Sequence, residues 1–135
     1  MLKKIIYDTR EFPFEKLEKI KTSKFSLPTK IDKEKLLLNI YLKQQAFVPL
    51  IYITQLKNGD RYFIKGQEII STLKELFEDK IELEFCDAMH EQYPKHFSNF
   101  KSFDKRLFKT FDFRVIFVDE IEKEEEIKEI IEFFV

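Results

Sequence analysis

Residues 49–78, PLIYITQLKNGDRYFIKGQEIISTLKELFE, combine two apolar runs, a tight-turn signal and a helical repeat. The runs Pro49–Leu56 and Arg61–Lys65 are apolar, β-branched and aromatic, which is typical of strands. The Asn58-Gly59 pair between them predicts a hairpin in which this pair supplies the positive φ angles of a tight turn. Over 67–78 apolar residues recur with the helical period, so we expect a helix to begin directly after the second strand.

Strand and helix signals alternate on both sides of this segment. Upstream we expect a short strand over 2–7, a helical turn beginning at Pro13, an extended segment over 22–30 and a helix from an Asp32 cap to about residue 45. Downstream we expect a half-buried strand over 81–85, an irregular stretch over 87–100, a short helix capped by Ser102, a strand over 111–118 and a closing helix over 122–134. The sequence therefore predicts an α+β fold, with a small mixed β-sheet and flanking helices, in one domain over 1–135.

The composition argues against several classes of protein. The chain has 24 Lys and Arg against 25 Asp and Glu, a net charge of -1, which argues against a strongly basic nucleic-acid module but leaves room for a local basic face. Its two glycines, Gly59 and Gly66, are too few for a G-x-G-x-x-G loop or a Walker P-loop. One cysteine excludes an internal disulfide, and no apolar run approaches the roughly 18 residues of a membrane span. We therefore expect a soluble cytoplasmic protein with no membrane partner.

Phenylalanine is unusually frequent, with 16 in 135 residues. This frequency predicts either a dense aromatic core or an exposed aromatic patch for a protein partner, and we favour the core. The stretch 97–117 interleaves phenylalanine with Lys105, Arg106, Lys109 and Arg114, a pattern that also suits base stacking and phosphate binding. Because these phenylalanines recur at helical and strand spacing, we expect most of them to face the core and the charges to face solvent.

The junction Lys65-Gly66-Gln67 is the most informative candidate site. A strand delivers the chain to one glycine, and a helix starts at once. The free N–H groups of a first helical turn, together with the helix dipole, favour an anion. Gly66 permits a close approach, while Lys65 and Gln67 add a charge and an amide. The junction is thus a candidate cradle for a phosphate or a carboxylate.

The same segment resembles the DUF262 family of the ParB/sulfiredoxin-like superfamily. Ile64–Leu73 (IKGQEIISTL) is similar to the family's D-G-Q-Q-R motif and the L-T-T-L that follows it, and Phe47–Ile53 is similar to its P-I-P-x-I strand. Further along the chain, Phe97–Phe100, Phe113–Val118 and Glu125–Phe133 follow the family's order of loop, strand and closing helix. The resemblance extends over roughly residues 25 to 134 and implies a ParB/sulfiredoxin-like fold.

The resemblance also implies a ligand and a context. Family members occur in DNA-modification-dependent restriction and phage defence, where the domain binds and hydrolyses nucleotides, and related ParB proteins bind CTP. It therefore implies a nucleoside triphosphate with Mg²⁺, or DNA phosphate, as the ligand, and a DNA-related or defence role.

This chain departs from the family motif at the positions that carry its chemistry. Lys65 replaces the aspartate, Glu68 the second glutamine and Ile69 the arginine, so only Gly66 and Gln67 remain. The upstream element is reduced to Leu27-Pro28-Thr29-Lys30, with no arginine after it. Losing both arginines removes the bidentate partners of phosphate oxygens, so we expect no turnover and no catalytic residue. Lys30, Lys65 and Arg61 are the charges that would compensate.

Three hypotheses follow from these features. The first is a degenerate DUF262/ParB-like module that binds a nucleotide or DNA phosphate without turnover at Gly66, Gln67, Lys65, Lys30 and Arg61. The second is an interaction or regulatory protein that has kept the fold, lost the ligand and pairs with a protein partner or with itself through exposed phenylalanines and the apolar C-terminus, Phe133-Phe134-Val135. The third is an active nucleotide hydrolase or nuclease. Convergence of Lys65 and Lys30 on an open pocket at Gly66 would favour the first hypothesis over the second.

Cys86, His90 and His96 form a C-x3-H-x5-H pattern with acidic residues nearby. This spacing matches no common zinc pattern, and a complete tetrahedral set is not evident. Nothing beside the thiol indicates an oxyanion hole or a lowered pKa. We therefore expect neither a metal site nor a nucleophilic cysteine here.

Overall fold

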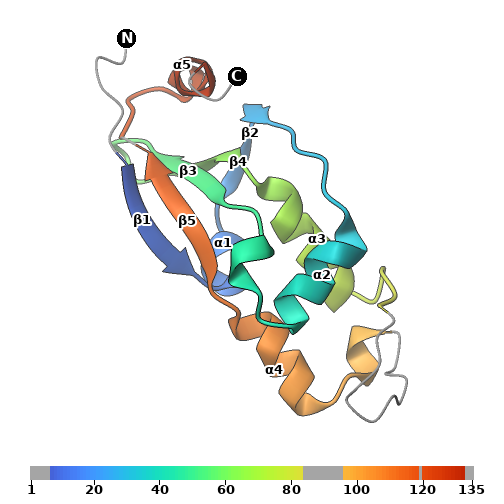
Figure 1. Ribbon diagram of the computed structural model, residues 1–135. Helices are drawn as coiled ribbons and strands as arrows, with labels where there is room; N and C mark the ends of the chain where they lie inside the picture. Colours follow the sequence, from blue (N-terminus) through green and yellow to red (C-terminus); the bar gives the residue numbers. More distant parts are fainter. Residues whose placement is uncertain (1–6, 84–95, 119, 133–135) are drawn as a thin grey trace.

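A computed structural model of the chain describes residues 7–83, 96–118 and 120–132. It is an α+β protein with a five-stranded mixed sheet and flanking helices (Figure 1), which confirms the predicted class. The strands are β1 (Tyr7–Phe12), β2 (Lys21–Leu27), β3 (Ile51–Gln55), β4 (Arg61–Lys65) and β5 (Phe113–Val118). The α-helices are α1 (Phe14–Leu17), α2 (Lys33–Tyr41), α3 (Gln67–Phe77), α4 (Ser102–Thr110) and α5 (Ile127–Ile131), and the 3-10 helices are η1 (Gln45–Phe47), η2 (Phe97–Asn99) and η3 (Glu124–Glu126).

The sheet has the order β1-β5-β3-β4-β2, with β3 at its centre. β3 runs antiparallel to β4 and parallel to β5. β1 adds to β5 in the antiparallel direction, and β2 adds to β4 in the parallel direction. β1 and β2 are therefore the two edge strands.

Side chains that alternate along the strands build a core on each face of the sheet. Ile51, Ile53 and Phe63 belong to the larger core, which packs under α1 to α4. Ile64 and Val118 point to the other face, where a smaller core is completed by Ile121, Ile127 and Ile130. In Figure 1 the red helix α5 accordingly lies apart from the cluster of α2, α3 and α4.

The predicted hairpin is present, but its turn differs from the prediction. Gly59 has a φ of 98°, whereas Asn58 has no positive φ, so the prediction for Asn58 was wrong. The Leu56 N–H donates to the Asp60 carbonyl at 2.8 Å, and the Gly59 N–H donates to the Leu56 carbonyl at 2.9 Å. The Asn58 Oδ1 accepts from the Asp60 N–H at 2.9 Å. The loop is thus longer than a two-residue turn and needs only one positive φ.

The segment after β5 ties this hairpin loop to the α5 side of the molecule. The Ile121 N–H donates to the Gln55 carbonyl at 2.9 Å, and the Lys57 N–H donates to the Ile121 carbonyl at 3.0 Å. The Lys57 Nζ lies 2.6 Å from the Glu122 Oε1. Hydrogen bonds therefore connect the hairpin loop directly to the segment that leads into α5.

The predicted helix boundaries agree with the structure at some ends and differ at others. The Asp32 Oδ1 caps α2 by accepting from the Lys35 N–H at 3.1 Å, as predicted. The helix stops at Tyr41 rather than near residue 45, because Lys43 takes a φ of 56° that no helix continues. α3 begins at Gln67 as expected. The Ser102 cap was wrong, since Lys101 occupies the cap position and Ser102 is the first residue of α4.

Other boundaries moved as well. Pro13 is the cap of α1 rather than part of its first turn. β5 starts at residue 113 instead of 111, and the closing helix covers 127–131 after a 3-10 turn instead of 122–134. Residues 81–83 form no strand, although Leu83 is buried, and residues 84–85 of that prediction lie outside the described part of the chain. Residues 2–6 also lie outside it, and the described strand begins at residue 7.

The expectation of a phenylalanine core is confirmed. Six phenylalanines are buried in the larger core: Phe12, Phe63, Phe97, Phe100, Phe108 and Phe113. The rings of Phe77 and Phe97 are 4.7 Å apart, and those of Phe97 and Phe100 are 5.4 Å apart. Phe47 and Phe103 are exceptions, 70% and 68% exposed. Among the described helices, none has the length and apolar character needed to cross a membrane.

Candidate functional site

The Gly66 turn is closed on one side by the neighbouring strand. Gly66 is buried and has a φ of 106°, and α3 begins at the next residue. A Cβ placed on it would lie 3.1 Å from the Ile51 Cα and 3.1 Å from its Cγ1. The glycine therefore serves the close approach of β3 to the start of α3. The space beside it is filled by Ile51.

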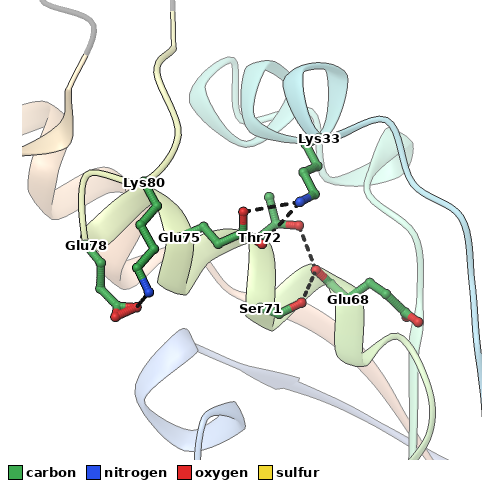
Figure 2. A network of polar contacts seen from close by, with 7 residues as sticks. All are labelled: Lys33, Glu68, Ser71, Thr72, Glu75, Glu78 and Lys80. Carbon is green, nitrogen blue, oxygen red and sulfur yellow. Dashed lines mark hydrogen bonds and ion pairs between the residues drawn. The ribbon is translucent and has the colours of Figure 1, made fainter.

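The start of α3 also carries its own negative charge. The Glu68 Oε2 accepts from the Thr29 N–H at 3.0 Å and from the Gln67 Nε2 at 3.3 Å. The same Gln67 nitrogen donates to the Leu27 carbonyl at 3.2 Å. Figure 2 shows the Glu68 carboxylate directed away from Ser71 and Thr72, whose hydroxyls donate to the Glu68 carbonyl. A carboxylate thus already lies in the first turn, where the helix dipole favours an anion.

Three buried oxygens surround this point. Within the described residues, the Thr29 Oγ1, the Gln67 Oε1 and the Glu68 Oε1 are buried without a hydrogen-bond partner. The Gln67 and Glu68 oxygens can only accept hydrogen bonds, and the Glu68 oxygen belongs to a carboxylate. A further anion would be repelled here, so the electrostatics of the turn differ from those of an empty phosphate cradle.

The structure does not bring the five predicted site residues together. Gly66 and Gln67 are adjacent by sequence, and the half-buried Lys65 ends β4 beside them. Lys30 instead lines a hollow of about 250 Å³ near α2 that includes neither Lys65 nor Gly66. Arg61 begins β4, which at about 3.3 Å per residue places it roughly 13 Å along the strand from Lys65. Lys30 and Arg61 thus line two different hollows, and neither hollow includes Gly66 or Lys65.

Arg61 lies in a second, strongly basic place that sequence reasoning missed. We call it the basic hollow, and its volume is about 490 Å³. Its lining comes from β1, from α1 and the turn after it, from the start of β2, from the hairpin loop and from the start of β4: Arg10, Phe12, Lys16, Lys19, Ile20, Lys21, Gly59, Asp60 and Arg61. It lies on the face of the sheet that α1 to α4 cover, since its lining residues Phe12 and Ile20 belong to the larger core. Five of its side chains are cations and one is a carboxylate.

Aromatic rings support the two arginines. The Arg10 guanidinium lies 4.9 Å from the centre of the Phe117 ring, and the Arg61 guanidinium lies 5.2 Å from the same centre. Arg61 also lies 5.8 Å from the Phe12 ring, and its Nε donates to the Gln55 Oε1 at 3.0 Å. Such cation–π contacts hold the planar guanidinium groups while leaving N–H groups free to bind carboxylate or phosphate oxygens.

Acidic neighbours neutralise only part of this charge. The Arg10 Nε lies 2.8 Å from the Asp8 Oδ2, and the Lys21 Nζ lies 3.3 Å from the Asp60 Oδ2. In the described part of the chain, Lys16, Lys19 and Arg61 form no ion pair with a carboxylate. The basic hollow therefore keeps an excess of positive charge, although the whole chain has a net charge of -1.

A partial signal for the basic hollow was present in the sequence. Arg10, Lys16, Lys19 and Lys21 lie within twelve residues of each other, but Glu11, Glu15 and Glu18 separate them and conceal the charge. Only the strand order shows that Arg61, far along the chain, belongs with them.

The remaining candidates are weaker. A hollow of about 420 Å³ beside the exposed Phe103 is lined by both signs of charge, including Glu11 and Arg106. Cys86 and His90 lie outside the described residues, and the His96 Nε2 lies 3.6 Å from the Glu82 Oε1. No group of three or more His, Cys, Asp or Glu in the described segments is placed to hold a metal ion.

In the described residues, the Gly66 turn is thus filled by Ile51 and Glu68, whereas the basic hollow at Arg61 is open. The resemblance to the DUF262 family stays a prediction that rests on the order and spacing of sequence segments. No protein-family model, no curated protein and no solved structure matches this chain.

Proposed function

We propose that the protein binds the phosphate groups of a nucleotide or of a nucleic acid in the basic hollow, without turnover. The observation that carries this proposal is the pair Arg10 and Arg61, which both form cation–π contacts with the Phe117 ring. Three lysines line the same hollow. Guanidinium groups bind phosphate oxygens through two parallel hydrogen bonds, and a hollow of about 490 Å³ is within the usual size range of small-molecule sites. The proposed ligand class is the one predicted from the sequence, but the proposed binding site is the basic hollow at Arg61 instead of the Gly66 turn.

The basic hollow has few acidic side chains that could activate water for hydrolysis. Among the described residues, Asp60 is the one carboxylate that lines the basic hollow, and it pairs with Lys21. A general base must be directed at the attacking water, whereas the Asp60 carboxylate is directed at the Lys21 ammonium. A nucleoside triphosphate would bring Mg²⁺ on its own phosphates, and the five cations would compete with that ion for the same oxygens.

We also propose the ParB/sulfiredoxin-like fold, a DNA-related or defence role and a cytoplasmic location. The support for the fold is the order of elements in the described chain, in which β4 leads through Gly66 directly into α3. The role and the location are those predicted from the sequence. The same order carries the resemblance to the DUF262 family.

Titration with labelled nucleotides and oligonucleotides tests the proposal. The double variant Lys16→Glu/Lys19→Glu reverses two exposed charges of the basic hollow. The matched control Lys35→Glu/Arg106→Glu makes the same charge change at exposed positions on α2 and α4. We expect the first variant to weaken binding by at least about tenfold, since a hydrogen bond to a charged group contributes about 1.5–3 kcal/mol. The control should stay within about twofold of the wild type. Absence of binding, or equal losses in both variants, contradicts the proposal.

A second candidate is the interaction protein that has lost its ligand. The observation in its favour is the Gly66 turn, which is filled by Ile51 and Glu68, together with the exposed Phe47 and Phe103. Sedimentation of the wild type and of Phe47→Ser/Phe103→Ser tests self-association. This candidate predicts a concentration-dependent dimer that the double variant abolishes. Phosphate release measured in the nucleotide titration tests the third hypothesis, an active hydrolase.

A further inference from the structure

We infer that the ligand of the basic hollow is a single-stranded nucleic acid whose backbone continues over the edge strand β2 to the opposite face of the sheet. This inference rests on the proposed function, phosphate binding in the basic hollow. It adds two residues outside the hollow, Lys24 and Lys128, as phosphate contacts.

Lys21 connects the two faces. It lines the basic hollow, where its Nζ lies 3.3 Å from the Asp60 Oδ2. The same Nζ lies 5.9 Å from the Tyr62 ring, and Tyr62 packs against the smaller core on the α5 side of the sheet. Lys21 therefore stands at the rim where the edge strand separates the two faces, and its side chain is 57% exposed.

Beyond the rim, cations continue along β2. Lys24 and Lys128 are exposed, and their Nζ atoms lie 5.1 Å and 4.6 Å from the ring of Phe25. Phe25 lies on β2 and packs against the smaller core together with α5. At about 3.3 Å per residue, Lys24 is roughly 10 Å along the strand from Lys21. Successive lysines are thus spaced for contacts to successive parts of one backbone.

The shape of this path selects a single strand. It turns from one face of the sheet to the other around one edge, within a few residues. Duplex DNA has a persistence length of about 150 base pairs and resists such a turn, whereas a single strand follows it. A mononucleotide in the basic hollow is too short to reach Lys128 as well. Glu124–Glu126 directly precede α5 and would repel a backbone that continued further, so we place the end of the path near Lys128.

Salt dependence distinguishes these ligands. For single strands, the slope of log affinity against log salt changes by about 0.7 for each phosphate contact. We would measure the slope with ATP, with oligo(dT) of about 3 and about 12 nucleotides, and with a duplex about 12 base pairs long, because single-strand site sizes run from about 4 to 16 nucleotides. The variant Lys24→Gln/Lys128→Gln removes two contacts, and Lys35→Gln/Arg106→Gln is the matched control.

We expect the double variant to reduce the slope for the longer oligonucleotide by about 1.4 and to leave ATP and the shorter oligonucleotide unchanged. The control should leave every slope unchanged. An unchanged slope with the longer oligonucleotide, or tighter binding of the duplex, overturns the inference. The proposed function stands in that case if ATP or the shorter oligonucleotide still binds through Lys16 and Lys19. Absence of binding by every ligand overturns the proposed function together with the inference.

Discussion

Gly66 and Gly59 have similar backbone angles in different surroundings. Their φ values are 106° and 98°, but a Cβ at Gly66 meets Ile51 whereas nothing lies within 4 Å of one at Gly59. We expect Gly59→Ala to lower the free energy of unfolding by about 1–2 kcal/mol, the cost of a positive φ. Gly66→Ala should lower it by about 1–3 kcal/mol more, because the methyl group overpacks the contact with β3. Urea denaturation of both variants checks this difference, and equal losses would contradict it.

Arg61 tests whether the basic hollow recognises phosphate geometry or only charge. Arg61→Lys keeps the charge but loses the planar fork and the hydrogen bond to Gln55. We expect the Kd for the bound nucleotide or oligonucleotide to rise about tenfold, equivalent to about 1.4 kcal/mol. Lys19→Arg is the opposite exchange in the same hollow and should not weaken binding. A Kd for Arg61→Lys equal to that of the wild type would leave charge alone as the basis of recognition.

Asp104 links stability to pH at a single residue. Burial raises the pKa of this carboxyl above its ordinary value of 3.8, and the Lys101 charge lowers it in part. The folded protein therefore retains the proton to higher pH than the unfolded chain does. The free energy of unfolding therefore falls as pH rises from the pKa of Asp104 in the unfolded chain through its raised pKa in the folded protein. Asp104→Asn should remove this fall, which unfolding measured from about pH 4 to about pH 7 would detect as a smaller loss of stability than in the wild type.

At the scale of elements, α5 depends on a small core. It has five residues, too few for a helix that is stable alone, and it packs through Ile127 and Ile130. We expect the amides of α5 to exchange with solvent faster than those of α3, and Ile130→Ala to speed exchange in α5 while α3 stays protected. Leu73→Ala is the control in the larger core, where we expect a loss of about 2–5 kcal/mol for the whole domain. Equal protection of α5 and α3 in the wild type would show that the two cores open together.

The elements that sequence predicted well are those with a local cause. The Asp32 side chain is a sufficient reason for α2 to start, and the periodic residues after Gly66 are a sufficient reason for α3. The apolar alternation over 81–85 failed for 81–83, because burial of Leu83 requires only packing and no strand partner. Ser102 failed as a cap because no signal inside the segment fixes which residue enters the helix first.

At the scale of the whole molecule, the basic hollow needed information that no local pattern holds. Arg10 and Arg61 lie on strands that β5 and β3 separate, and both arginines contact Phe117 of β5. The sequence identified Arg61 as a candidate only as a replacement for lost motif charges. Its real neighbours follow from the strand order. The Gly66 junction, in contrast, was located correctly because its residues are consecutive.

The tie between the hairpin loop and Ile121 has a thermodynamic consequence. Arg61 directly follows the loop, and the segment held by Gln55 and Lys57 leads into α5. Opening of α5 and occupancy of the basic hollow are thus linked equilibria that share one support. Linkage is reciprocal, so a ligand that lowers the equilibrium constant for opening of α5 by some factor must bind more weakly by the same factor when α5 is held open. Hydrogen exchange in a helix on the far face of the sheet would then report on binding at Arg61 without a label on the ligand.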